Sequence, residues 1–116
     1  MFYCKLLGFH EDMHPSPFFA MLSRDDLRLV LSKPGGGAGG GQVMPDGRLP
    51  EPGGWNRFAI EVSDIETIVK TLRQAGVGFR SNIISGVGVK QCLIDDPSGN
   101  PIELFQPILP EAHLTK

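Results

Sequence analysis

Residues 57–76 read RFAIEVSDIETIVKTLRQAG, and two hydrophobic periods follow each other in this stretch. In its first part, Phe58, Ile60 and Val62 alternate with other residues, which is typical of a half-buried β-strand. In its second part, apolar residues stand at positions 65, 68, 69 and 72, the spacing of one face of a helix. The stretch therefore predicts a strand followed by an amphipathic helix.

Both ends of the predicted helix carry local signals. Residues 63–66, SDIE, match a capping box, in which the Ser63 hydroxyl accepts from the third helical N–H and Glu66 reaches back. Gly76 follows the last apolar position, and glycine readily takes the left-handed conformation that ends many helices. We expect the helix to lie between these residues.

The rest of the second half predicts three further strands. Turn-forming residues occupy positions 85–88 and 96–100, and the segments between them are rich in apolar residues. The expected strands are residues 77–83, 90–95 and 101–106. The order of elements is strand, helix, strand, strand, strand.

The first half repeats this order without its opening strand. We expect a helix over residues 2–7 that ends at Gly8, then strands over residues 9–12, 17–22 and 27–31. The sequence thus predicts an α+β fold of two βαβββ modules, of which the first is incomplete.

A segment rich in glycine and proline separates the two halves. Residues 33–54 hold most of the 15 glycines of the chain, and such a composition favours a mobile linker. We expect a single domain over residues 1–110, with a first module in 1–32, a second module in 55–110, and a tail in 111–116.

Charge and composition exclude several classes of partner. The net charge is −2 and no basic block is present, so nucleic-acid binding is not expected. No apolar run is long enough to span a membrane, and no leader sequence is evident. Cys4 and Cys92 suggest no disulfide framework, and we expect a cytoplasmic protein with free thiols.

Three segments resemble one protein family. Residues 2–9, 56–64 and 96–104 are similar to a helix-to-strand junction, a module start and a final turn and strand of the vicinal oxygen chelate superfamily, which includes glyoxalase I, bleomycin-resistance proteins and extradiol dioxygenases. The resemblance implies paired modules whose mixed sheets curl around a cleft.

The family normally opens with a strand that supplies a histidine metal ligand, and Met1 stands where that strand would end. Either the true start lies upstream, or a second chain completes the sheet. Because an open sheet edge invites pairing, we expect a homodimer.

The resemblance also locates the family's metal ligands. Its second-module histidine aligns with Arg57, its last-strand glutamate with Glu103, and the corresponding first-module position with Arg28. Arginine is always protonated and has no lone pair for a cation. We therefore predict that Glu103, the only candidate metal ligand, pairs with Arg57 and Arg28 and that no catalytic metal binds.

Strand alternation places Arg57 and Glu103 on the cleft side of the second module. Together with Arg28, they form the predicted polar anchors for an anionic or carbonyl oxygen of a small molecule; a buried salt bridge that merely fills the metal position is the alternative. Phe105 and Trp55 complete the expected ligand-contacting set, and Trp55 is also expected to pack at the start of its strand.

Two sequence motifs are set aside. Residues 10–14, HEDMH, match the zinc-protease pattern, but two prolines follow at once and no extended helix can carry the two histidines. The glycine pattern of residues 35–40 precedes no helix, so it has no helix N-terminus to hold a pyrophosphate.

Three functions fit these observations. The leading hypothesis is a binding protein for a small molecule, without a catalytic metal. The second is a metal-dependent lyase, isomerase or dioxygenase whose ligand-bearing first strand is missing from this chain. The third is a non-catalytic dimerisation module.

Overall fold

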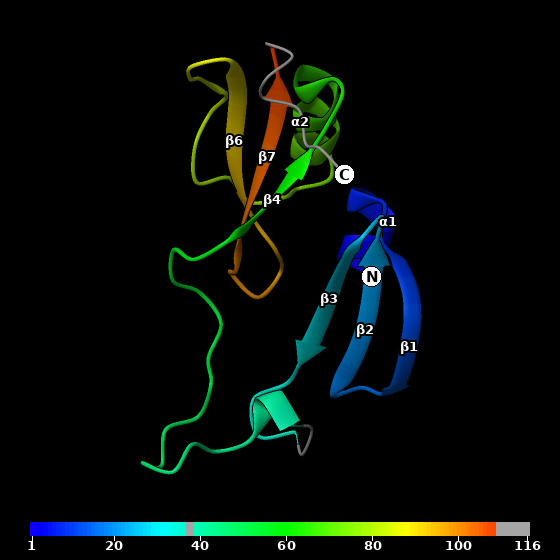
Figure 1. The fold of residues 1–116 in the computed structure, drawn as a ribbon, viewed down its shortest axis with the longest axis vertical. Helices are drawn as coiled ribbons and strands as arrows, with labels where there is room; N and C mark the ends of the chain where they lie inside the picture. The colour runs from blue at the N-terminus through cyan, green and yellow to red at the C-terminus, as the bar shows by residue number, and fades with distance from the viewer. Residues whose placement is uncertain (37–38, 109–116) are drawn as a thin grey trace. The chain divides into compact units, whose positions relative to one another are not determined.

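The computed structural model describes residues 1–36 and 39–108, and the expected tail lies outside them. The chain divides into two compact units, Met1–Glu51 and Pro52–Lys116. Each unit contains one sheet and one α-helix, so the predicted α+β class is confirmed (Figure 1). Among the described residues, no helix has both the length and the apolar character that crossing a membrane requires.

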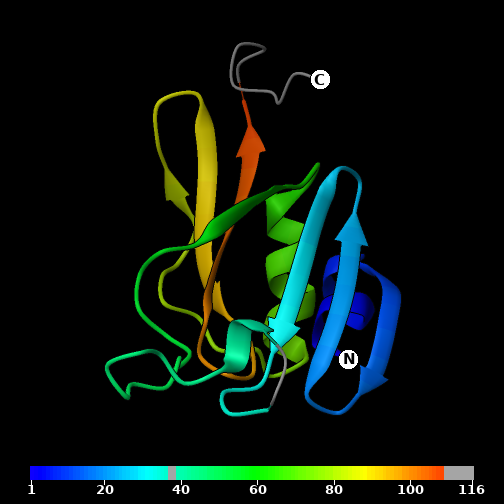
Figure 2. The same cartoon turned by 60° about the horizontal axis from the view of Figure 1, so that its bottom comes forward.

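The first unit is a helix followed by a three-stranded antiparallel sheet (Figure 2). Its elements are α1 (Phe2–Leu7), β1 (His10–Ser16), β2 (Phe19–Arg24) and β3 (Leu27–Ser32), with strand order β1-β2-β3. The helix ends at Gly8 as predicted. The unit's core consists of Tyr3, Leu7, Phe9, Ala20 and Leu22.

The glycine-rich segment contains a short 3-10 helix, η1 (Gly39–Gly41). Beyond it, the Met44 N–H donates to the Arg48 carbonyl across 2.8 Å, which closes a turn. Arg48 also forms a salt bridge with Asp46 at 2.7 Å.

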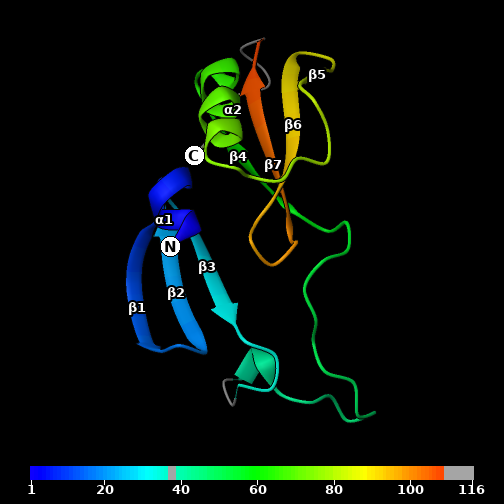
Figure 3. The same ribbon diagram turned by 180° about the vertical axis from the view of Figure 1, so that it is seen from behind.

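The second unit has a four-stranded mixed sheet. Its elements are β4 (Phe58–Glu61), α2 (Ile65–Gln74), β5 (Ile84–Ser85), β6 (Val89–Asp95) and β7 (Pro101–Pro107), with strand order β4-β7-β6-β5. Only the β4–β7 pair is parallel. The last strand in the sequence therefore occupies an interior position of the sheet (Figures 1 and 3).

The residue that begins α2 differs from the prediction. The N-cap is Asp64, one position after the predicted Ser63, because the first helical residue is Ile65. The Asp64 carboxylate accepts from the Thr67 N–H at 3.3 Å and from the Thr67 hydroxyl at 2.7 Å. Glu66 does not close a capping box; instead it binds the Lys90 ammonium at 2.6 Å.

The end of α2 agrees with the prediction. Gly76 has a φ of 81°, in the left-handed region. Its N–H donates to the Arg73 carbonyl, and the Val77 N–H donates to the Leu72 carbonyl. This pair of bonds is the Schellman motif, which satisfies carbonyl groups that the last helical turn leaves open.

The predicted strand over residues 77–83 is wrong. The segment forms an isolated bridge between Phe79 and Ile94, and regular pairing begins only at β5. Here the N–H groups of Arg80 and Ser81 both donate to the Leu93 carbonyl, so the chain follows the edge of β6 without forming a regular ladder.

α2 covers one face of the second sheet (Figure 3). The side chains buried in this layer come from α2 and from alternate strand positions: Ile60, Ile65, Val69, Leu72, Cys92, Ile94, Ile102 and Leu104. Cys92 is fully buried, which raises the pKa of its thiol, and it lies 3.5 Å from the Ser81 carbonyl. It is a core residue of the second unit.

The opposite side of the sheet is called the helix-free face below. Strand register assigns to it Ala59, Glu61, Val89, Gln91, Leu93, Asp95, Pro101, Glu103 and Phe105. This face carries Glu103 and Phe105, two of the predicted site residues of the second unit.

Candidate ligand-binding site

An arginine–carboxylate pair lies at the centre of the helix-free face. The parallel register places Ala59 beside Glu103, so Arg57, two residues earlier on the same side, reaches the Glu103 carboxylate. Its Nε and Nη2 atoms both lie 3.1 Å from Glu103 Oε1. The Glu103 side chain is 18% exposed and that of Arg57 is 34% exposed. The predicted Arg57–Glu103 pair is thus present in the structure.

The second oxygen of Glu103 also has a partner. Gln91 on β6 donates through Nε2 to Glu103 Oε2 at 3.2 Å. Gln91 was not predicted as a site residue. Its only sequence signal is an amide at a position where strand alternation points away from the helix.

These residues do not fit a divalent metal ion. Of the three family ligand positions that the resemblance places in this chain, two are arginines, which have no lone pair to donate. Both oxygens of the remaining ligand, Glu103, accept hydrogen bonds from Arg57 and Gln91. In the described parts of the chain, no group of three or more histidine, cysteine, aspartate or glutamate side chains is arranged to hold a metal.

A second arginine organises the end of the helix-free face. Arg80 donates from Nε to Asp95 Oδ1 at 2.6 Å, from Nη1 to the Gly54 carbonyl at 2.6 Å, and from Nη2 to the Gly99 carbonyl at 2.9 Å. Its guanidinium also lies 4.6 Å from the centre of the Trp55 ring. Sequence reasoning missed Arg80, because its partners come from three distant segments.

Trp55 does not pack into a core. The residue is 67% exposed, and the contacts described for it are the Arg80 guanidinium on its ring and Arg57 Nη1, which donates to its carbonyl at 3.2 Å. The expectation that Trp55 packs at the strand start is therefore wrong. Its backbone is fixed at one end of the site while its indole stays accessible.

The remaining predicted residues occupy different places. Phe105 lies on the helix-free face, half-buried, opposite Gln91 on β6 and Glu61 on β4. Arg28 is an exposed residue of β3 in the first unit, and its pairing with Glu103 stays a prediction.

The zinc-protease pattern lies on a strand, although the sequence predicted a strand only over residues 9–12. Residues 10–14 belong to β1, where His14 lies 3.3 Å from Glu11 and His10 lies 3.7 Å from Asp12. An extended backbone does not present these two histidines as a helix would. The motif is therefore not a zinc-protease site.

A sequence model of the glyoxalase/bleomycin resistance protein/dioxygenase superfamily matches residues 1–104. The chain belongs to this superfamily. No curated protein matches the chain.

Solved structures of the superfamily show the same fold. A member from Sphaerobacter thermophilus is 26% identical, with a TM-score of 0.65 over 90% of this chain and 82% of that one. A lactoylglutathione lyase from Agrobacterium tumefaciens is 15% identical, with a TM-score of 0.67 over 90% and 80%. The antibiotic-binding protein TnmS3 from a Streptomyces species is 21% identical, with a TM-score of 0.63 over 91% and 81%.

Proposed function

We propose that this superfamily member binds a small molecule on the helix-free face of its second sheet, without a catalytic metal. Arg57 is the main polar anchor and meets an anionic or carbonyl oxygen of the ligand. Phe105 and Leu93 supply apolar contact on either side of the polar residues. The proposed activity is binding, not chemical conversion.

The observation that carries this proposal is that both carboxylate oxygens of Glu103 accept hydrogen bonds from neighbouring side chains. Its two oxygens accept from Arg57 and Gln91, so the family's last-strand ligand is part of a hydrogen-bonded network. Such a network holds the Arg57 guanidinium in one orientation. A preorganised donor binds an oxygen atom with less loss of side-chain entropy than a mobile one.

The comparisons support binding as a function of this fold. One structurally similar protein is described as antibiotic-binding and another as a lyase. Because both are less than 25% identical to this chain, the choice between them rests on the residues of the site. There Arg57 stands at the position that the family resemblance assigns to a metal-binding histidine.

Metal binding tests the metal-free part of the proposal. We would titrate Zn²⁺ and Ni²⁺ into the full chain by calorimetry, beside the Glu103→Gln variant. We expect no micromolar binding that depends on Glu103. Micromolar affinity that disappears in Glu103→Gln would overturn the proposal and favour the metal-dependent enzyme.

Ligand binding tests the anchor. A panel of small aromatic acids, ketones and phenols would be screened by nitrogen-15 NMR, with the amides of β6 and β7 as reporters. We expect at least one class to shift these amides, and Arg57→Met to weaken its binding at least about fivefold, as expected for loss of a charge-assisted hydrogen bond.

Arg48→Met is the matched control for that experiment. Arg48 also pairs with a carboxylate, that of Asp46, but its side chain is 83% exposed and belongs to the glycine-rich segment. We expect its removal to leave the binding of the panel unchanged. Binding that is equally sensitive to both arginines, or indifferent to Arg57, contradicts the anchor role.

A homodimer in a reducing compartment completes the proposal. β3 is an edge of the first sheet and, within the described residues, pairs with β2 alone, whereas its counterpart β7 has a neighbour on both sides. An edge of this kind invites a strand from a second chain. Cys4 and Cys92 are both free thiols, which supports a cytoplasmic location.

A further inference from the structure

We propose that Arg80 is a positioning residue that holds Trp55 as a stacking platform beside Arg57, and that the site therefore selects planar aromatic molecules bearing an oxygen acceptor. The inference deepens the proposed function and rests on it. It assigns a ligand class and a role to two residues, Trp55 and Arg80.

Arg80 is more buried than its charge would suggest. Its side chain is 17% exposed, and its three nitrogen atoms donate to Asp95, Gly54 and Gly99. A planar guanidinium fork satisfies these three directions at once, which a lysine ammonium on a flexible stem does not. Arg80 therefore fixes the position of the segment that leads into Trp55.

The backbone around Trp55 is anchored at three consecutive residues. The Gly53 N–H donates to Asn100 Oδ1 at 2.9 Å, the Gly54 carbonyl accepts from Arg80, and the Trp55 carbonyl accepts from Arg57. Gly53 and Gly54 have φ values of 108° and 81°, in a region of backbone conformation that residues other than glycine rarely adopt. The backbone of residues 53–55 is thus held in one conformation, yet the large aromatic side chain of Trp55 remains exposed.

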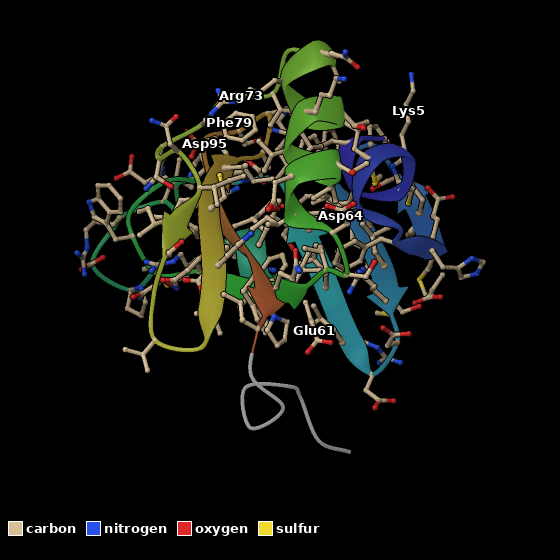
Figure 4. The ribbon with its side chains drawn as sticks, turned by 90° about the horizontal axis from the view of Figure 1, so that it is seen from above. Lys5, Glu61, Asp64, Arg73, Phe79 and Asp95 are labelled. Atoms are coloured by element: carbon tan, nitrogen blue, oxygen red, sulfur yellow. The ribbon has the colours of Figure 1, made fainter. Side chains whose placement is uncertain are left out.

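A second arginine–aromatic pair in the same unit shows that the arrangement at Trp55 is unusual. The guanidinium of Arg73, in the last turn of α2, lies 4.1 Å from the centre of the Phe79 ring (Figure 4). There the phenylalanine is half-buried and the arginine is the exposed partner. At Trp55 the order is reversed, since the Arg80 side chain is only 17% exposed and the Trp55 residue is 67% exposed.

That reversal indicates a ligand-facing role for the indole. A pair that stabilises the fold covers much of its aromatic ring, as at the half-buried Phe79, because burial of apolar surface supplies the free energy. With Arg80 against it, the Trp55 ring is held from the protein side while solvent reaches the rest of it. A flat aromatic ligand can stack on that accessible surface.

The charges beside Trp55 narrow the ligand class. Arg57 is paired with Glu103, and Arg80 is paired with Asp95, so each cation is locally neutralised. Arg57 Nε and Nη1 donate to Glu103 and to the Trp55 carbonyl, and Nη2 lies 3.1 Å from Glu103 Oε1. Within the described residues, the remaining N–H groups of Arg57 are open to a ligand oxygen. These features favour one oxygen acceptor on an aromatic ring over a multiply charged anion such as a phosphate.

The single tryptophan of the chain provides a direct readout. Because the chain has no other tryptophan, the indole N–H signal in a nitrogen-15 NMR spectrum of the full chain belongs to Trp55 without further assignment. The probe is 2-naphthoate, a planar ring system with a carboxylate, and the comparison compound is its saturated analogue, decahydro-2-naphthoate. We expect 2-naphthoate to shift the indole signal saturably and the saturated analogue to bind about threefold to tenfold more weakly.

Variants separate positioning from stability. We expect Trp55→Leu to weaken 2-naphthoate binding about threefold to tenfold, and Arg80→Met to weaken it to a similar extent. In the Trp55→Leu background, Arg80→Met should have no further effect on affinity, because Arg80 acts through the ring. Arg80→Lys provides a milder change where Arg80→Met folds poorly, and Arg73→Met is the matched control, expected to bind as the wild type does.

Three outcomes overturn the inference. The first is an indole signal that does not move at millimolar 2-naphthoate; the second is equal affinity for the saturated analogue; the third is an Arg80→Met effect that persists undiminished without Trp55. If 2-naphthoate shifts the β6 and β7 amides but leaves the indole unmoved, this inference fails and the proposed function stands. Absence of Arg57-dependent binding across the wider panel instead removes the proposed function.

Discussion

At the scale of single residues, the neighbours of Glu103 decide its chemistry. A carboxylate on the helix-free face could act as a metal ligand or as the acceptor of an ion pair. Arg57 and Gln91 occupy both of its oxygens, and Arg57 stands where the superfamily resemblance places a histidine. An arginine at that position cannot donate a lone pair to a cation, which is why we propose that this site meets a ligand oxygen instead.

Removing Glu103 should destabilise the fold. We expect Glu103→Ala to lower the free energy of unfolding by about 1–3 kcal/mol, because it leaves the Arg57 guanidinium without its carboxylate partner in a partly buried place. Urea denaturation measures the change. Glu66→Ala is the control, since its pair with Lys90 lies at an exposed position, and it should cost clearly less. Equal losses in the two variants contradict the predicted importance of the Arg57–Glu103 pair.

Asp96 is a second residue with a predictable effect. It is 7% exposed and accepts from the N–H groups of Ser98 and Asn100 and from the Asn100 amide. Asp96→Ala leaves these donors unsatisfied inside the turn that starts β7, so we expect a loss of about 2–3 kcal/mol by the same measurement. Ser98→Ala keeps every one of these hydrogen bonds and should behave as the wild type does.

At the scale of elements, α2 responds to pH through the residue that caps it. The Thr67 hydroxyl and backbone N–H donate to Asp64 and lower its pKa below the ordinary value of 3.8. A depressed folded-state pKa means that the stabilisation is complete above the unfolded pKa and is lost as pH falls through the folded value. Asp64 thus stabilises α2 at neutral pH and ceases to do so in acid.

The Asp64→Asn variant isolates this effect. Its amide keeps an N-cap oxygen without a titrating charge. We expect the melting temperature of Asp64→Asn to lie below that of the wild type near neutral pH, and the difference to shrink as the pH falls from about 6 to about 2.5. A difference that is constant over this range contradicts a role for the Asp64 charge. Lys90 lowers the pKa of Glu66 as well, so Glu66→Gln should respond in the same direction.

Periodicity explains which elements the sequence predicts correctly. The helix at residues 65–74 and the strands around residues 58–61, 89–95 and 101–107 carry either a clear apolar period or flanking turn residues. Residues 77–83 also contain apolar side chains at strand spacing. Two of their N–H groups, those of Arg80 and Ser81, donate to the same acceptor, the Leu93 carbonyl, so no regular ladder forms. Whether a segment completes a ladder depends on a neighbour far away in the sequence, which local pattern does not report.

The residues of the candidate site also divide into those that the sequence predicts and those that only the fold reveals. The pairing of Arg57 with Glu103 follows from strand alternation together with the family resemblance, and both are properties of the sequence. Gln91 and Arg80 join the site through cross-strand register and a loop, which only the folded chain supplies. Trp55 was expected to pack at the start of its strand because an aromatic residue there usually covers a core, but the residue is 67% exposed.

At the scale of the whole molecule, the two units repeat one plan with one difference. In the second unit β7 lies between β4 and β6, whereas in the first sheet the equivalent strand β3 lies at the edge of the described strands. If a second copy covers that edge, the protein in solution has twice the 12.6-kDa mass of the chain.

Light scattering after size-exclusion chromatography measures this mass directly. We expect a dimer at micromolar concentration, and Val30→Lys on β3 should shift the equilibrium towards the monomer, because a charge on an edge strand opposes strand addition. Val43→Lys, a change at an exposed apolar residue of the glycine-rich segment, is the control and should leave the mass unchanged. A monomer at all concentrations rules out the dimer.

The interior position of β7 has a consequence for biosynthesis. A ribosome releases β4 long before it releases β7, yet β4 has no other described strand beside it, and its register joins residues 58–61 to residues 102–105. The nascent second unit cannot close its sheet until β7 has emerged. A message truncated just before the codons of β7 would thus yield a polypeptide with Ile60 and Ile94 uncovered, a ready substrate for chaperones and proteases.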